Sequence, residues 1–249
     1  MSLGIAPGDA RKAALKLLLG KVQELDAVEV SSGTALHRFS LVSVSYGITA
    51  DVDCESERFR FLGALRFHVE AVAKICTFAR KPGLMRVKQV RGVLLGDGSD
   101  RGAFPRHGLG PCAPRSSSTA STRPFAPKDD NAANSGGIVL SEREEHGPFV
   151  GIILSNVPFL SYDMQFTPFG SPSDGLIDVM SLTTGISRWG LLWSVFLRVG
   201  NGAHIEAASV QENVRYYKAE QVELEGLDPG SVLDIDGEFY WGYSRVTAR

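Results

Sequence analysis

Hydrophobic and polar residues alternate most regularly between residues 38 and 53. Apolar side chains occupy every second position from Val42 to Val52, and Ser, Gly, Thr and Asp stand between them. A period of two is typical of a half-buried β-strand, so this segment is predicted to be one. Shorter runs between Pro and Gly turns predict further strands over residues 85–95, 149–156, 163–166, 175–182, 214–218, 221–225 and 232–238.

Other segments carry apolar residues at steps of three and four, which is the spacing of a buried helical stripe. Residues 57–80 have this pattern and end at Pro82-Gly83. Residues 9–19 predict a helix that Asp9 caps and Gly20 ends, and residues 189–199 predict another. Strands outnumber helices, so a β-rich α+β fold is expected, an antiparallel β-sandwich with two or three helices.

Residues 96–136 differ from the rest of the chain in composition. Of these 41 residues, 17 are Gly, Pro or Ser. Such a segment buries too little apolar surface to fold, so we interpret it as a long disordered insertion in a surface loop. The sandwich is then expected to be built from residues 31–95 and 137–249.

Charge and cysteine content narrow the functional classes. The net charge of −2, with a pI near 6.2, gives no global attraction to nucleic acid, so no nucleic-acid partner is expected. Three scattered cysteines make neither a disulfide framework nor a closed zinc site, which favours a reducing cytoplasmic setting. No apolar run approaches the roughly 18 residues that a membrane span needs, so membrane contact is expected to be peripheral.

Asp51 and Asp53 would share one face of the strand predicted over 38–53, beside the small residues Ser45 and Thr49. A small polar trough that ends in two acids can seat a ligand. The alternative is a half-buried strand whose polar side faces water and whose acids cap the next helix. Pattern alone leaves both open.

Two other sets of charged residues invite similar alternatives. Arg60 and Arg66 are six residues apart, about 240° around a helix, and would share one anion only if the helix began near them. Asp234, Asp236 and Glu238 would share one face of a strand. Either a cation or basic partner neutralises these acids, or they protect an exposed sheet edge.

Three motifs resemble those of sphingosine kinases, within the broader sphingosine and diacylglycerol kinase family. The first is the run from Ser45 to Asp53 followed by Glu55-Ser56-Glu57, Arg60, Leu62-Gly63 and Arg66-Phe67. The other two are Asp174-Gly175-Leu176-Ile177-Asp178 and Asp236-Gly237-Glu238. The resemblance covers only the family's C-terminal, lipid-binding part. It implies that residues 1–30 are a remnant of the segment that follows a nucleotide-binding domain.

The resemblance also implies roles for particular residues. Asp53 would bind the amine and hydroxyl of a sphingoid base, with Ile48 and Asp51 also at the lipid. The cofactors would be ATP and Mg²⁺, with Glu238 near the metal. The implied nucleotide-binding residues are Arg60, Arg66, Asp236, Gly237 and Glu238. No residue here matches the family's catalytic Asp, so the chain alone is expected to be inactive, as a fragment, a truncated gene model or a split gene.

The leading hypothesis is therefore the lipid-binding domain of an ATP-dependent sphingoid-base kinase. Its partners would be a sphingoid-base lipid, a transient membrane surface and a nucleotide-binding domain in cis or in trans. One alternative is a non-catalytic module that binds a lipid or a protein and has lost the kinase half. Another is a structural β-domain without a ligand.

Overall fold

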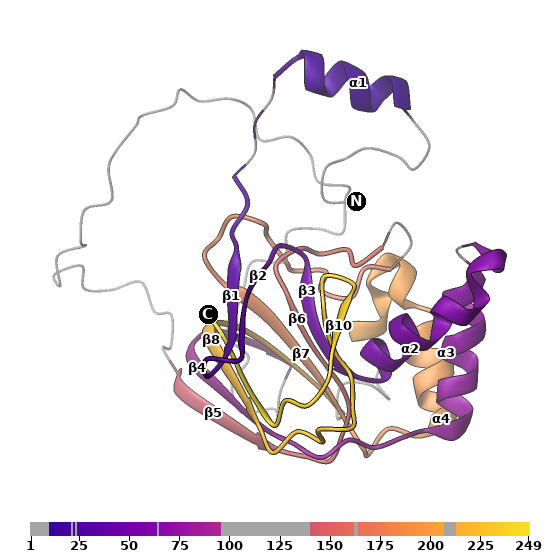
Figure 1. Ribbon diagram of the computed structural model, residues 1–249, viewed down its shortest axis with the longest axis vertical. Coiled ribbons are helices and arrows are strands. Elements are labelled where there is room, and N and C mark those ends of the chain that lie inside the picture. Colours follow the sequence, from indigo (N-terminus) through magenta and orange to yellow (C-terminus); the bar gives the residue numbers. More distant parts are fainter. Residues whose placement is uncertain are drawn as a thin grey trace, which may run out of the picture.

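The computed structural model describes residues 10–20, 22, 24–63, 65–95, 140–161, 164–206 and 213–249 (Figure 1). The described strands form one antiparallel sheet with the order β10-β9-β3-β6-β7-β8-β11-β1-β2, and β4 and β5 extend it from β8. The strands are β1 (Val28–Ser32), β2 (Leu36–Ser40), β3 (Ser43–Gly47), β4 (Leu84–Leu95), β5 (Leu140–His146), β6 (Phe149–Ser155), β7 (Ile177–Thr183), β8 (Val214–Glu225), β9 (Leu233–Ile235), β10 (Glu238–Tyr240) and β11 (Arg245–Ala248).

The helices gather on one side of this sheet, apart from α1 (Figure 1). They are α1 (Ala10–Leu18), α2 (Ile48–Ser56), η1 (Glu57–Leu62), α3 (Leu65–Thr77), α4 (Arg188–Gly190), η2 (Leu191–Phe196), η3 (Val199–Asn201) and η4 (Ala203–Glu206). The described part of α1 buries no residue. Within the described residues, no helix is long and apolar enough to cross a membrane.

The sheet branches and curls at β8. β4 pairs with β8 from Tyr216 to Glu225, whereas β7 pairs with the first half of β8 and β11 with its last four residues. One face of the curled sheet packs against itself in a large core. The other face carries a second core under the helices, so β6 alternates between the two: Ile152 and Leu154 belong to the first, Ile153 to the second.

The β-rich α+β class is confirmed, but the two separate sheets of a sandwich are not, because hydrogen bonds connect all the described strands. The predictions for 85–95, 149–156 and 175–182 are confirmed by β4, β6 and β7, and the pair predicted over 214–225 is the single strand β8. Of the strand predicted over 163–166, the described residues 164–166 contribute an isolated bridge between Met164 and Ser161. The predicted insertion lies outside the described residues.

The single strand predicted over 38–53 is divided between β2 and β3 by a bend at Leu41 and Val42, and the prediction is wrong beyond Gly47. There the chain takes φ +87° and turns from β3 into α2. A Cβ at this position would lie 2.6 Å from the Val150 carbonyl oxygen and 2.9 Å from the Gly151 Cα. The turn therefore depends on a close approach to β6, and Asp51 and Asp53 lie on a helix rather than on one strand face.

Residues with a positive φ angle also interrupt two other predicted elements. Gly63, at φ +57°, separates η1 from α3, so residues 57–80 do not form one helix. Asp236 and Gly237, at φ +53° and +85°, make a turn between β9 and β10. The acids at 234, 236 and 238 therefore do not share a strand face. The helix predicted over 189–199 is divided into α4, η2 and η3.

Gly47→Ala is expected to destabilise the protein by more than about 3 kcal/mol, because it adds a backbone clash to the cost of a left-handed conformation. Gly226→Ala is the matched control: its φ is +63°, and its Cβ would meet nothing within 4 Å. That control should cost only about 1–2 kcal/mol. Denaturant unfolding of both variants measures the difference, and equal losses would contradict the role given to the β6 contact.

Candidate functional site

Two carboxyl groups meet where α2 lies against β9. Asp53 on α2 lies near enough to Asp234, which is only 6% exposed, for each carboxyl group to influence the pKa of the other. The Ser45 hydroxyl of β3 donates to Asp234 Oδ2 at 3.1 Å, and the Gly237 amide donates to Oδ1 at 2.8 Å. Sheet register explains the contact between Ser45 and Asp234, because these residues are direct neighbours on β3 and β9.

Burial raises the pKa of both carboxyl groups. For Asp234 the value reaches about 6, and the nearby charge of Asp53 adds to the effect of burial. For Asp53, burial is the largest cause, and the guanidinium of Arg66 partly opposes it. The site therefore resists carrying two negative charges, and a cation would stabilise it.

Arg60 and Arg66 converge on a single carboxylate beside this acid pair. Arg60 Nε lies 2.5 Å from Glu57 Oε2, and Arg66 pairs with Glu57 Oε1. The break at Gly63 lets both guanidinium groups reach one anion, as the helical geometry required. The Arg60 side chain is 76% exposed and that of Arg66 17%, so the clamp opens to solvent on the Arg60 side.

The turn between β9 and β10 is fixed by the Asp236 carboxylate. Four donors from the end of β2 and the start of β3 converge on it: the Ser40 hydroxyl at 2.8 Å and the amides of Leu41, Val42 and Ser43 at 2.7, 3.0 and 2.8 Å. With these donors in place, Asp236 acts as a structural clamp between two turns.

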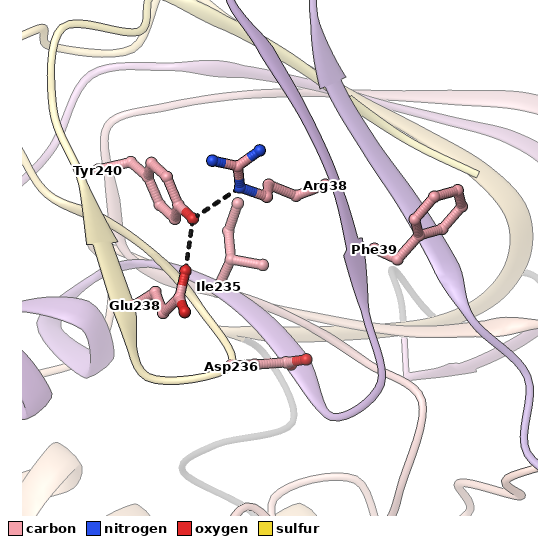
Figure 2. Close-up of a pocket in the computed structure, with 6 residues that line it drawn as sticks. All are labelled: Arg38, Phe39, Ile235, Asp236, Glu238 and Tyr240. Carbon is pink, nitrogen blue, oxygen red and sulfur yellow. Dashed lines mark hydrogen bonds between the residues drawn. The ribbon is translucent and has the colours of Figure 1, made fainter.

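An open pocket lies beside this turn, between the edge strands β2 and β10. It is lined by Arg38, Phe39, Ile235, Asp236, Glu238 and Tyr240, as Figure 2 shows. The Tyr240 hydroxyl accepts a hydrogen bond from Arg38 Nε at 3.1 Å and donates one to Glu238 Oε2 at 2.7 Å. These contacts join the two ends of the sheet.

Glu238 by itself does not make a magnesium site. The described part of the chain contains no group of three or more His, Cys, Asp or Glu residues able to hold a metal ion. The neighbouring Asp236 carboxylate already accepts four donors.

Ile48 and Asp51 lie away from Asp53. Ile48 packs against the core beneath the helices. Asp51 is buried and pairs with Lys81 Nζ at 3.2 Å. Two positions along a helix are about 200° apart, so the trough predicted to contain both acids is not formed.

The Asp-Gly-Leu-x-Asp motif lies away from Asp53, at the pairing of β7 with β8. Asp178 is fully buried on β7 and binds Lys218 Nζ of β8 at 3.0 Å and the Tyr216 hydroxyl at 2.5 Å. Lys218 also binds Asp174 at 2.8 Å. These contacts tie β7 to β8 through a buried ion pair.

Sequence reasoning missed the contacts that Asp234 and Glu57 make. Asp234 was assigned to a face with Asp236 and Glu238, although its place between Leu233 and Ile235 in an apolar strand is a signal for a buried acid. Glu57 enters the sequence analysis only as part of the Glu55-Ser56-Glu57 motif. Its position three residues before Arg60 favours a local ion pair, but the second pair, with Arg66, depends on the break at Gly63.

Comparisons with known proteins agree with the motifs. The chain is 26% identical to "Sphingosine kinase 1" of Arabidopsis thaliana over 242 residues, which cover 93% of this chain and 45% of that protein. It is also 26% identical to "Sphingosine kinase 1" of Homo sapiens over 218 residues, with 86% and 50% covered. The chain thus spans about half the length of these relatives. No protein-family model matches it.

The fold has a counterpart among solved structures. A protein assigned as a diacylglycerol kinase from Bacillus anthracis str. Sterne superposes with a TM-score of 0.54 at 14% identity, covering 97% of this chain and 58% of that one. Over most of its length the chain is similar in sequence to sphingosine kinases, and it shares its fold with this solved structure. The predicted resemblance is confirmed.

Asp236→Ala is expected to lower the free energy of unfolding by about 2–3 kcal/mol, because charge-assisted hydrogen bonds to four donors are lost. Glu238→Ala is the control, since Glu238 is exposed and accepts only the Tyr240 hydroxyl among the hydrogen bonds described. It should cost less than about 1 kcal/mol. Urea unfolding measures both, and an Asp236 variant as stable as the control would contradict the clamp.

Proposed function

We propose that this chain is the lipid-binding part of an ATP-dependent sphingoid-base kinase. Paired with a nucleotide-binding domain in cis or in trans, it would present a lipid hydroxyl to the γ-phosphoryl group of ATP. One observation carries the proposal: a half-buried acid that favours a cation, Asp53, lies near Arg66, one of two arginines that converge on the Glu57 carboxylate. A cationic lipid head group and a phosphate need these opposite charges side by side.

Asp53 is suited to a sphingoid base by charge. Such a lipid carries an ammonium and hydroxyl groups, and a carboxylate accepts hydrogen bonds from both. An ammonium beside Asp53 would also relieve the cost of ionising a half-buried acid near Asp234. Diacylglycerol has no cation, so this acid favours sphingosine over diacylglycerol.

Arg60 and Arg66 are suited to the phosphates of a nucleotide. Guanidinium groups bind carboxylate and phosphate oxygens in similar geometry, so the Glu57 carboxylate shows that the clamp accepts an anion of this kind. A phosphate would replace Glu57 between the two arginines. There it would lie close to Asp53, because Arg66 is near enough to influence that carboxyl group.

The proposed reaction transfers one phosphoryl group. The lipid hydroxyl oxygen forms a bond to the γ-phosphorus, the bond from that phosphorus to the β–γ bridging oxygen breaks, and ADP leaves. The hydroxyl proton passes to a base that we place on the nucleotide-binding domain. The arginines would neutralise charge that develops on the phosphate oxygens.

Peripheral membrane contact is part of this proposal. Large apolar side chains are exposed on η1, α3, α4 and η2, which lie on one side of the sheet (Figure 1). They include Phe61 (81% exposed), Leu65 (58%), Trp189 (71%) and Trp193 (61%). Such a surface favours a transient contact with the cytoplasmic face of a bilayer, from which the lipid would enter.

Asp53→Asn is expected to weaken sphingosine binding by about 1–3 kcal/mol, because the amide cannot balance the ammonium charge. Glu55→Gln is the matched control on the same helix, since Glu55 is exposed and pairs with Lys74. Calorimetric titration of the purified chain with sphingosine in dilute detergent measures both. Unchanged affinity in the Asp53 variant would reject the head-group assignment.

Arg60→Ala and Arg66→Ala are each expected to weaken ATP binding by about 1–3 kcal/mol and to leave sphingosine affinity nearly intact. Arg80→Ala, at an exposed arginine after α3, is the control. With a nucleotide-binding domain supplied, turnover should fall in the two variants but not in the control. Loss of lipid binding would contradict the phosphate role, and lipid binding with no turnover by the wild-type pair would favour the non-catalytic alternative.

A further inference from the structure

The Glu57 carboxylate occupies the arginine clamp, the pair Arg60 and Arg66 to which the proposed function assigns a phosphate. Its Oε2 lies 2.5 Å from Arg60 Nε, and its Oε1 pairs with the terminal nitrogen of Arg66. Carboxylate and phosphate oxygens bind a guanidinium group in similar geometry. Glu57 and a phosphate therefore cannot hold the same position between the two arginines at once.

Two other ion pairs connect the helices around the arginine clamp without Glu57. Glu55 of α2 pairs with Lys74 of α3, and Arg58 of η1 pairs at 2.7 Å with Glu70 of α3, which is 1% exposed. These pairs hold α2 and η1 against α3 whether or not Glu57 contacts the arginines. Glu57 can leave the clamp while the elements that carry the clamp stay in place.

Withdrawal of Glu57 from the arginine clamp costs little free energy. The Glu57 side chain is 34% exposed and η1 buries no residue, so a change of rotamer brings the carboxylate into water. Arg60 is 76% exposed, which makes its pair with Glu57 a surface ion pair. Such pairs are each worth a factor of roughly 1.5 to 5 in an equilibrium constant. A stronger anion can therefore displace this carboxylate.

Charge determines which anions are stronger than Glu57. Two arginines and one carboxylate leave a net charge of +1 in the clamp. A dilute monoanion only exchanges one carboxylate-like partner for another, and the internal carboxylate has an effective concentration on the order of millimolar. A chain of phosphates brings several negative charges and more acceptor oxygens, so it gains more from two guanidinium groups.

We propose that Glu57 is an internal competitor for the phosphate site: it occupies the arginine clamp in the unliganded chain and moves into solvent when a polyphosphate binds. This role rests on the proposed function, because it takes the arginine clamp to be a phosphate site. Glu57 lowers the affinity of the clamp for all anions. At low concentration only a ligand with several phosphates then fills it.

The test is calorimetric titration of the full chain with inorganic tripolyphosphate, which carries the phosphate chain of ATP without the nucleoside. Glu57→Gln should bind it about three- to tenfold more tightly than the wild type, because the isosteric amide is uncharged and competes weakly. Glu55→Gln is the matched control: it removes the same charge two residues away, from a side chain that pairs with Lys74. Its affinity should stay within about twofold of the wild type.

A measurement on the wild-type chain tests the displacement without any substitution, and so also covers a variant that fails to fold. In carboxyl-carbon NMR spectra, the Glu57 signal should move as tripolyphosphate is added, because the carboxylate exchanges two guanidinium partners for water. The Glu55 signal should stay in place, since its pair with Lys74 is kept.

The results separate this role from the proposed function. If Arg60→Ala and Arg66→Ala lose tripolyphosphate binding while Glu57→Gln binds no more tightly than the wild type, the competitor role is overturned alone. A Glu57 signal that stays fixed at saturating tripolyphosphate has the same meaning. Binding by neither the wild type nor Glu57→Gln, or binding that survives both arginine substitutions, overturns the phosphate site and the competitor with it.

Discussion

The arrangement of the site depends on the Asp236 carboxylate. Four donors at the end of β2 and the start of β3 hold it, so the β9–β10 turn is locked to the strand from which α2 emerges. That lock puts Asp234 next to Ser45 and beneath α2. Without it, only three residue pairs with β3 and three with β10 would fix the register of β9, and Asp234 would be held less firmly in place.

Local hydrophobic periodicity was sufficient to predict the strands whose two faces differ and the strands that are buried on both faces. β4, β6 and β7 were predicted on that basis. It failed at Gly47, where apolar residues continue to alternate although the chain turns into a helix. The turn depends on a close approach to Val150 and Gly151 on another strand, and no local pattern contains that information.

The residues of the candidate site also fall into those that local sequence could predict and those that it could not. Asp53, Arg60 and Arg66 could be selected because they lie in one continuous motif, and the break that lets both arginines reach one anion is at Gly63 in the same motif. Ser45 and Asp234 are 189 residues apart, so their contact follows from strand pairing alone. Conversely, Asp51 looked equivalent to Asp53 only because the segment was interpreted as a strand.

A crystal structure of the chain with bound sphingosine tests the central claim most directly. The account predicts the lipid amine within hydrogen-bond distance of the Asp53 carboxylate, close to Arg66 and on the side that faces Asp234. A head group bound in the pocket between Arg38 and Tyr240, or anywhere away from Asp53, would contradict it.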